Sequence, residues 1–250
     1  MNDSIRAMVL YEDPSFLIVD KPAGLPTVPL KDSPPDEETL LTQVGASFPE
    51  VLTVNGRNSW EGGMTHRLDT PTSGLVVIAR SNEAYQRLLS TAQAGLFVKE
   101  YHARCSATER VMHPSFPPYP YEDPVHCGGR EVAVGSLFRH WGEHRRAVRP
   151  VLSDSPRHIL EKSSATWYLT RVFYGGMTLD GAHSFTCNLT AGFRHQVRAH
   201  LAWSGWPIDG DDTYGGMEGD TLALRAVGVE FPHPYTSQII EVWADRQGVK

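Results

Sequence analysis

A loop that leads directly into an apolar segment constrains the fold of this chain more than any other stretch. Residues 66–74 read His-Arg-Leu-Asp-Thr-Pro-Thr-Ser-Gly, and residues 75–79 are all apolar. The apolar run predicts a buried strand, and the proline and glycine restrict the backbone of the loop before it. We therefore expect the acid of the loop, Asp69, to be held rigidly, as a reactive carboxylate in a cleft must be. The alternative is that Asp69 only caps a turn, because Asp followed by Thr-Pro favours turns.

The composition is typical of a folded protein without a membrane segment. The chain has 250 residues, of which 40% are hydrophobic and 21% charged, and such a chain is long enough to bury a sizeable core. No apolar run is long enough to cross a bilayer, and the first residues lack the apolar region of a signal peptide. The three cysteines are far apart and odd in number. They predict a reducing, cytoplasmic location without a disulfide framework or a zinc knuckle.

Apolar and period-two patterns predict more strands than helices. Strands are expected at residues 8–11, 16–19, 75–79, 97–104, 165–173, 182–189, 222–229 and 238–243. Helices are expected near residues 40–44, 82–94 and 194–205. In the last of these, Arg194 and Arg198 are four residues apart and would share one helix face.

Many strands, few helices and little β-α-β alternation predict an α+β fold. We expect a mixed, largely antiparallel central sheet flanked by helices and loops. Residues 1–250 are predicted to form a single domain, with a proline-rich peripheral insertion at about 106–162.

Three stretches in series carry a family resemblance. The loop at 66–74 is followed by Lys99-Glu100-Tyr101, and then by Gly-Phe-Arg-His-Gln-Val-Arg-Ala-His-Leu at residues 192–201. A Gly-Trp-Pro-Ile-Asp-Gly-Asp stretch at 205–211 and a Tyr-Gly pair at 214–215 complete the series. In this order the stretches resemble the motifs of the RluA-type RNA pseudouridine synthases. The chain departs from the family pattern at residues 193–194, where it has Phe-Arg and the relatives usually have Arg-Thr.

The resemblance implies an isomerase that converts specific uridines of ribosomal or transfer RNA to pseudouridine. It also implies that residues 1–250 are a single catalytic domain, without the separate N-terminal RNA-binding module of some relatives. The reaction breaks a carbon–nitrogen glycosidic bond, turns the uracil and joins its C5 to the ribose. It requires a nucleophile, a nucleotide extruded from its stack and a group that removes a proton. We expect no metal, no other cofactor, no membrane partner and a monomer.

By resemblance, Asp69 is the nucleophile, Tyr101 stacks on the uracil and helps to move a proton, and Arg198 pairs with the catalytic aspartate. A guanidinium at that place would keep the carboxylate ionised and oriented. The alternatives are that Tyr101 fills the core and that Arg198 lies on a solvated helix face. Because Arg194 stands beside the departure from the family pattern, the sequence leaves open which arginine reaches Asp69.

Four further residues are expected to bind the RNA. By resemblance, Arg67 enters the space left by the flipped nucleotide, where a guanidinium can stack and contact phosphate. The alternative is an ordinary salt bridge in the loop. Leu189 is expected to wall the uracil pocket, or else to belong to the core. His66 and Arg194 complete the set, with His66 expected to be a hydrogen-bonding scaffold.

The net charge of −6 is unusual for a protein that binds nucleic acid. The charge is segregated, however, because residues 32–38 are acidic whereas residues 139–149 are basic. The basic side chains are those of Arg139, His140, His144, Arg145, Arg146 and Arg149. Such a distribution predicts one RNA-facing side.

Two other functions fit parts of the sequence. One is a non-catalytic RNA-binding protein on the same fold, which the acidic balance leaves open. The other is a metal-dependent hydrolase that uses Asp209, Asp211, Asp212 and histidines. His195 and His200 are five residues apart, which is not the spacing of a helical metal-binding pair.

Overall fold

The computed structural model describes residues 8–29, 34, 37–142 and 147–244. The chain packs as two compact units, the first formed by residues 1–99 and 225–250 and the second by residues 100–224. Among the described residues, no helix has the length and apolar character that a membrane span requires.

The first unit contains a mixed sheet with the strand order β1-β2-β3-β9, and β10 pairs with β9. The pairs β1–β2, β2–β3 and β9–β10 are antiparallel, whereas β3 and β9 are parallel. The strands are β1 (Val9–Glu12), β2 (Phe16–Lys21), β3 (Ser73–Ala79), β9 (Leu224–Pro232) and β10 (Ile239–Trp243). The helices are α2 (Leu40–Ser47), the short 3₁₀ helix η1 (Pro49–Thr53) and α3 (Asn82–Gln93).

Strand register brings two loops of the first unit together. The last residue of β2, Lys21, lies opposite Gly74 near the start of β3. The loop that follows β2 and the loop that precedes β3 therefore lie side by side at one end of the sheet. Gly74 has a φ of 118°, and a Cβ there would meet the Ala226 carbonyl oxygen at 2.1 Å, so only glycine fits this close approach.

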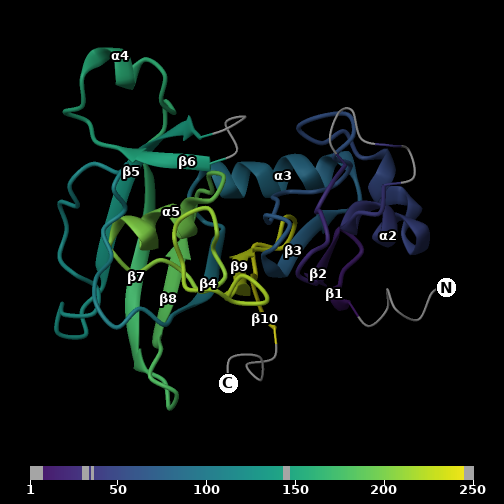
Figure 1. Ribbon diagram of the computed structural model, residues 1–250. Helices are drawn as coiled ribbons and strands as arrows, with labels where there is room; N and C mark the ends of the chain where they lie inside the picture. The colour runs from purple at the N-terminus through teal and green to yellow at the C-terminus, as the bar shows by residue number, and fades with distance from the viewer. Residues whose placement is uncertain (1–7, 30–33, 35–36, 143–146, 245–250) are drawn as a thin grey trace. The chain divides into compact units, whose positions relative to one another are not determined.

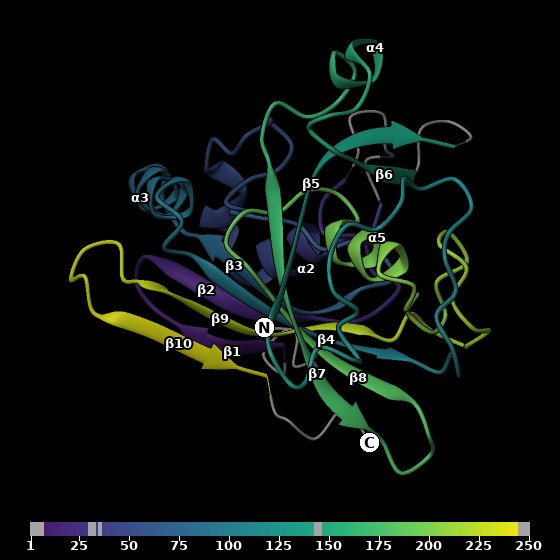
Figure 2. The ribbon, with the colours of Figure 1, turned by 90° about the vertical axis from the view of Figure 1, so that its left-hand side faces the viewer.

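The second unit contains a sheet with the strand order β4-β8-β7-β5-β6. The pairs β5–β6, β5–β7 and β7–β8 are antiparallel. The strands are β4 (Val98–Cys105), β5 (Val132–Trp141), β6 (Ala147–Val151), β7 (Tyr168–Met177) and β8 (His183–Leu189). Helix α5 (Gln196–Trp203) packs against β6 and β7, and the short α4 (Arg157–Leu160) lies beyond β6 in both ribbon views (Figures 1 and 2).

The predicted fold class is confirmed, since both units combine few helices with a sheet that is largely antiparallel. The predicted single domain stays a prediction. Residues 106–162 contain β5, which pairs with β7 inside the sheet of the second unit. Of the predicted basic cluster, residues 144–146 lie outside the described residues.

The prediction that Arg194 and Arg198 share one face of the last helix was wrong. The helix begins at Gln196, because His195 has a left-handed φ of 55° that a helix cannot contain. Arg194 therefore precedes the helix and does not share a face with Arg198. Every residue of α5 is also buried, so the helix has no solvated face.

Candidate functional site

The backbone on both sides of Asp69 is fixed by hydrogen bonds within the first unit. The Thr27 hydroxyl donates to the Leu68 carbonyl oxygen at 2.8 Å and accepts from the Leu68 N–H at 3.2 Å. After the acid, the Thr72 N–H donates to the Asp69 carbonyl oxygen at 3.0 Å, which closes a turn. The rigid loop predicted around this carboxylate is therefore present.

A buried lysine connects the Asp69 loop to the loop after β2. The Lys21 side chain has no exposed surface, and its ammonium donates to the carbonyl oxygens of Pro22, Leu25 and Thr70 at 2.9, 2.7 and 3.1 Å. Burial lowers the pKa of Lys21 to about 8, and the Asp69 carboxylate acts in the opposite direction by favouring the charged ammonium. No role was predicted for Lys21 from the sequence. Only the three-dimensional structure shows the acceptors around it.

His66 is held as a neutral ring. Its Nε2 accepts from the Val77 N–H at 3.3 Å, and its Nδ1 is buried without a hydrogen-bond partner among the described residues. Burial and the nearby ammonium of Lys99 lower the pKa of His66 to about 3. The ring also packs edge-on against Phe97 at 5.7 Å. These contacts fit the predicted scaffold, and the lowered pKa means that the ring does not take up a second proton near neutral pH.

Arg67 is anchored at one end and exposed at the other. Its Nη1 lies 2.9 Å from Oε1 of Glu61, whose side chain is 5% exposed, whereas 54% of the Arg67 side chain is exposed. The ordinary salt bridge is therefore present. An exposed guanidinium held in this way can still stack on a base or contact phosphate.

In the second unit, the central feature is a buried ion pair between Arg198 and Asp211. Arg198 Nε donates to Asp211 Oδ2 at 2.8 Å and Nη2 donates to Oδ1 at 2.7 Å, in a two-pronged arrangement. The side chains are 6% and 0% exposed. Nη2 also donates to the Thr213 hydroxyl at 3.1 Å, and the guanidinium lies over the Tyr214 ring at 5.4 Å. The alternative of a solvated Arg198 was therefore wrong.

Asp211 is a residue whose role the sequence reasoning missed. It was considered only as a metal ligand, although it belongs to the Gly-x-Pro-Ile-x-Gly-Asp stretch that carries the family resemblance. That stretch was the available signal, but nothing in it identified Arg198 as the partner.

Tyr101 and Leu189 lie on neighbouring strands of the second sheet. Tyr101 is 9% exposed on β4, and Leu189 is 5% exposed as the last residue of β8. Lys99 and Tyr101 are two residues apart on β4, so both side chains leave the same face of that strand. Near-complete burial fits both a core position and the wall of a base pocket, so the predicted roles of Tyr101 and Leu189 stay predictions.

Arg194 is exposed and lies in the loop before α5. Its Nε donates to His195 Nε2 at 3.4 Å, and His195 Nδ1 lies 3.1 Å from the Tyr214 hydroxyl. Arg194 therefore lies at the surface of the loop, whereas Arg198 is the buried and oriented arginine.

The acids proposed for a metal-dependent hydrolase have other partners. Asp209 accepts from the Ser106 N–H at 2.7 Å and from the Ser106 hydroxyl at 2.6 Å, and it pairs with Arg104. Asp211 is occupied by Arg198. In the part of the chain that the structure describes, no three histidine, cysteine or acidic side chains gather as a metal site would require. The hydrolase hypothesis thus has no ligand set among these residues.

Comparison with known proteins gives a consistent result. Residues 15–203 match the family model described as RNA pseudouridylate synthase. Ribosomal large subunit pseudouridine synthase D of Vibrio parahaemolyticus is 26% identical over 252 residues, covering 94% of this chain and 66% of that protein. The protein of the same name from Pseudomonas aeruginosa is 29% identical, with 93% and 66% covered. The chain thus spans just under two thirds of the length of these relatives.

Two solved human structures share the fold. Human RNA Pseudouridylate Synthase Domain Containing 1 aligns with a TM-score of 0.61 at 20% identity, covering 94% of this chain and 82% of that one. Human RNA Pseudouridylate Synthase Domain Containing 4 aligns with a TM-score of 0.64 at 16% identity, covering 97% and 90%.

Proposed function

Because the chain belongs to the RNA pseudouridylate synthase family, we propose that it isomerises specific uridines to pseudouridine in ribosomal or transfer RNA. The observation that carries the proposal is the Asp69 loop. Its backbone is fixed on both sides, and the carboxylate interacts electrostatically with the fully buried Lys21 ammonium. A rigid, ionised carboxylate is the form in which an aspartate acts as a nucleophile.

Asp69 is the proposed nucleophile. In the reaction, the carboxylate takes up the sugar or base temporarily while the glycosidic bond breaks, and is released when C5 of the turned uracil bonds to the ribose. Proton removal from C5 completes the reaction, and Tyr101 is the proposed group that stacks on the uracil and helps to move this proton.

Arg198 is the proposed partner that keeps the nucleophile ionised and oriented. Support comes from its own geometry, because two hydrogen bonds to Asp211 and one to Thr213 fix the plane of the guanidinium. A guanidinium held in one plane can present its remaining edge to a carboxylate with little loss of side-chain entropy.

Four residues are proposed to bind the extruded nucleotide or its neighbours. Arg67 has the exposed guanidinium needed to enter the space that the nucleotide leaves, and Arg194 has the exposure needed to contact phosphate. Leu189 is proposed as an apolar wall for the uracil, and His66 as the neutral support of the Asp69 loop.

Ribosomal RNA is the better supported of the two substrate classes, because both relatives described above are named for the large ribosomal subunit. We propose that the protein acts as a monomer in the cytoplasm. The three cysteines are free and buried, as is usual for a protein from a reducing compartment.

The test is to incubate the purified chain with RNA from cells that lack the other synthases and to map pseudouridine chemically. Asp69→Asn, which preserves the volume of the side chain, should abolish the product while thermal unfolding stays cooperative. Asp212→Asn is the matched control, because Asp212 is an exposed acid. Modification by Asp69→Asn at the normal rate would overturn the assignment. RNA binding without modification by the unaltered chain would favour the non-catalytic alternative.

A further inference from the structure

Most described arginines of the second unit pair with a carboxylate, and two of those that do not lie on one hairpin. Most described arginines lie within 4.0 Å of a carboxylate; they are Arg67, Arg80, Arg87, Arg104, Arg110, Arg130, Arg157, Arg171, Arg198 and Arg225. In the second unit, Arg139, Arg149 and Arg194 have no such partner among the described residues. Arg139 and Arg149 both belong to the β5–β6 hairpin.

These two arginines lie directly opposite each other. The antiparallel register pairs Arg139 on β5 with Arg149 on β6, so both side chains leave the same face of the hairpin. Side chains at such positions have Cβ atoms only about 5 Å apart, and like charges there destabilise the pair. The two groups affect each other, because burial and the charge of Arg139 lower the pKa of Arg149. The fold therefore holds together two cations that repel each other.

A flat aromatic surface continues the same face. Trp141 is two residues beyond Arg139 on β5 and pairs with Ala147, so it shares the face of the arginines. The indole is half-buried and contacts the His113 ring edge-on at 5.6 Å, and His113 in turn stacks on Phe116 at 4.1 Å. Basic groups beside partly exposed rings are the combination with which proteins bind single-stranded nucleic acid.

We propose that Arg139 and Arg149 bind the sugar-phosphate backbone of the substrate RNA, with Trp141 beside them to contact a base or sugar. The inference rests on the proposed function and assigns part of its RNA-binding surface. A phosphodiester supplies the negative charge that the protein does not, and two guanidinium groups on one face can each present two parallel donors to phosphate oxygens. Binding of RNA relieves the repulsion between the two cations.

Because the two arginines repel each other, a stability measurement can distinguish an RNA-binding role of these residues from a structural role. Removing a residue that only stabilises the hairpin lowers stability. Removing one of two repelling cations does not, because the repulsion disappears with it. The variants Arg139→Gln and Arg149→Gln should therefore keep or raise the thermal midpoint while they weaken RNA binding.

The experiment measures binding of the full chain to a ribosomal RNA transcript by fluorescence anisotropy over a range of salt concentrations. Each substitution should weaken binding by about threefold to tenfold and reduce the slope of log K against log salt by about 0.7–0.9. Arg139→Gln/Arg149→Gln should reduce the slope by about twice that amount.

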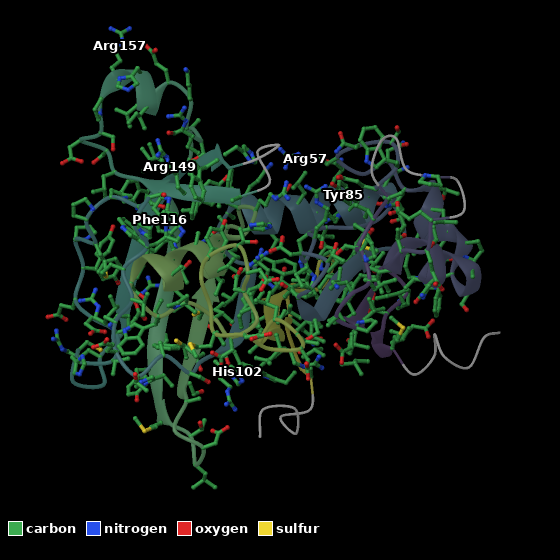
Figure 3. All side chains as sticks on the ribbon, in the orientation of Figure 1. Arg57, Tyr85, His102, Phe116, Arg149 and Arg157 are labelled. Atoms are coloured by element: carbon green, nitrogen blue, oxygen red, sulfur yellow. The ribbon has the colours of Figure 1, made fainter. Side chains whose placement is uncertain are left out.

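Two matched controls carry the same substitution at neutralised arginines. Arg171 pairs with Glu131 on the surface of the same unit, and Arg157 pairs with Glu161. Figure 3 shows Arg157 at the far end of α4, well beyond Arg149 on β6. Arg171→Gln and Arg157→Gln should change RNA affinity by less than about twofold, because each removes a cation together with its ion pair.

Unchanged affinity and salt slope in Arg139→Gln/Arg149→Gln would overturn the inference. Polyglutamate serves as a probe for an acidic protein partner. If the same double variant binds RNA normally but no longer binds polyglutamate, the inference is overturned as well, because the hairpin would then recognise an acidic protein. Neither result depends on catalysis. Absence of pseudouridine in RNA treated with the unaltered chain would instead defeat the proposed function, and the binding measurement would still be interpretable.

Discussion

Substitution of Asp211 should disturb the orientation of the Arg198 guanidinium while the arginine itself stays in the chain. Asp211→Asn keeps the size of the side chain but replaces the carboxylate with a neutral amide. The amide oxygen can accept one of the two hydrogen bonds that Arg198 donates at 2.8 and 2.7 Å. The amide nitrogen is a donor and would face a second donor, so the guanidinium must turn or lose a contact.

The expected magnitude follows from burial. The two side chains are 6% and 0% exposed, so water cannot replace the lost carboxylate. Leaving a buried charge without its partner destabilises a protein by about 3–5 kcal/mol, and the retained amide contact places Asp211→Asn near the lower end of that range. Given the proposed role of Arg198 as the partner of the nucleophile, a displacement of its guanidinium by about 1 Å should reduce kcat on the order of 100-fold.

A double variant separates these two effects. Arg198→Met together with Asp211→Leu removes both charges and keeps the interior filled. Replacement of a buried ion pair by apolar side chains is often neutral within about 1 kcal/mol, so stability should return while activity stays lost. Urea denaturation followed by circular dichroism measures the first quantity, and single-turnover pseudouridine formation measures the second.

Two results would refute this reasoning. One is an Asp211→Asn variant whose free energy of unfolding lies within about 0.5 kcal/mol of that of the unaltered chain and which modifies RNA at the same rate. The ion pair would then neither stabilise the fold nor orient Arg198. If the double variant is active, Arg198 is only structural. Asp212→Asn, at the exposed neighbouring acid, is the control for a general effect of acid removal.

Three further predictions follow from buried groups. The kcat/KM value should fall as pH rises through about 8, because Lys21 then loses the charge that interacts with Asp69; a pH profile that stays flat to pH 9.5 would contradict this. Burial lowers the pKa of His200 from 6.5 to about 3, so the folded chain cannot take up the proton that the unfolded chain binds below pH 6.5. Stability should therefore decrease as pH falls from 6.5 towards 3, by about 2 kcal/mol for this group at pH 5, and urea titrations of His200→Gln should show a shallower pH dependence. Gly74→Ala should destabilise the first unit by at least about 2 kcal/mol in thermal melts, because its Cβ would meet the Ala226 carbonyl; an unchanged melting temperature would refute the close approach.

The sequence predicted those elements whose signals are local. Helix α3 begins after Ser81, whose hydroxyl accepts from the Ala84 N–H, and it is followed by Gly95 with a φ of 73°. The helix was expected at residues 82–94, and such boundaries can be predicted because capping chemistry depends on only a few neighbouring residues. Strand β4 alternates between buried and half-buried residues along its length, as its period-two pattern indicated.

Prediction from the sequence failed where the environment of a residue depends on a partner that is distant along the chain. In helix α5 the polar residues Gln196, Arg198 and His200 interrupt the apolar residues, and a solvated helix face was the alternative considered for Arg198. All three are buried, and each is satisfied by a partner from another element. Gln196 donates to Thr170, Arg198 binds Asp211, and His200 lies between Ser136 and Thr170. Periodicity cannot distinguish a solvated polar residue from a buried one that has such partners.

The start of α5 shows the same limit at the level of the backbone. The sequence does not indicate that His195 has a left-handed backbone conformation, since that conformation is usual for glycine and uncommon for histidine. In the folded chain, the His195 ring contacts the Tyr214 hydroxyl, which also accepts from the Val148 N–H. The conformation is therefore over-determined by tertiary contacts and displaces Arg194 from the helix.

The buried cation of the first unit, Lys21, and that of the second unit, Arg198, are held in different ways, and this determines which experiments can isolate their roles. The partner of Arg198 is a side chain, so both charges can be deleted together and the stability recovered. The acceptors of Lys21 are the carbonyl oxygens of Pro22, Leu25 and Thr70, which no substitution removes. Lys21→Met would leave buried carbonyl groups unpaired, at a cost of about 1–3 kcal/mol each, and would lose fold and function together. The role of Lys21 beside Asp69 must therefore be measured by titration, and Lys99→Gln is the control because burial also lowers the pKa of Lys99 to about 8. An alkaline limb that persists in Lys99→Gln would assign the titrating group to Lys21, whereas loss of that limb would assign it to Lys99.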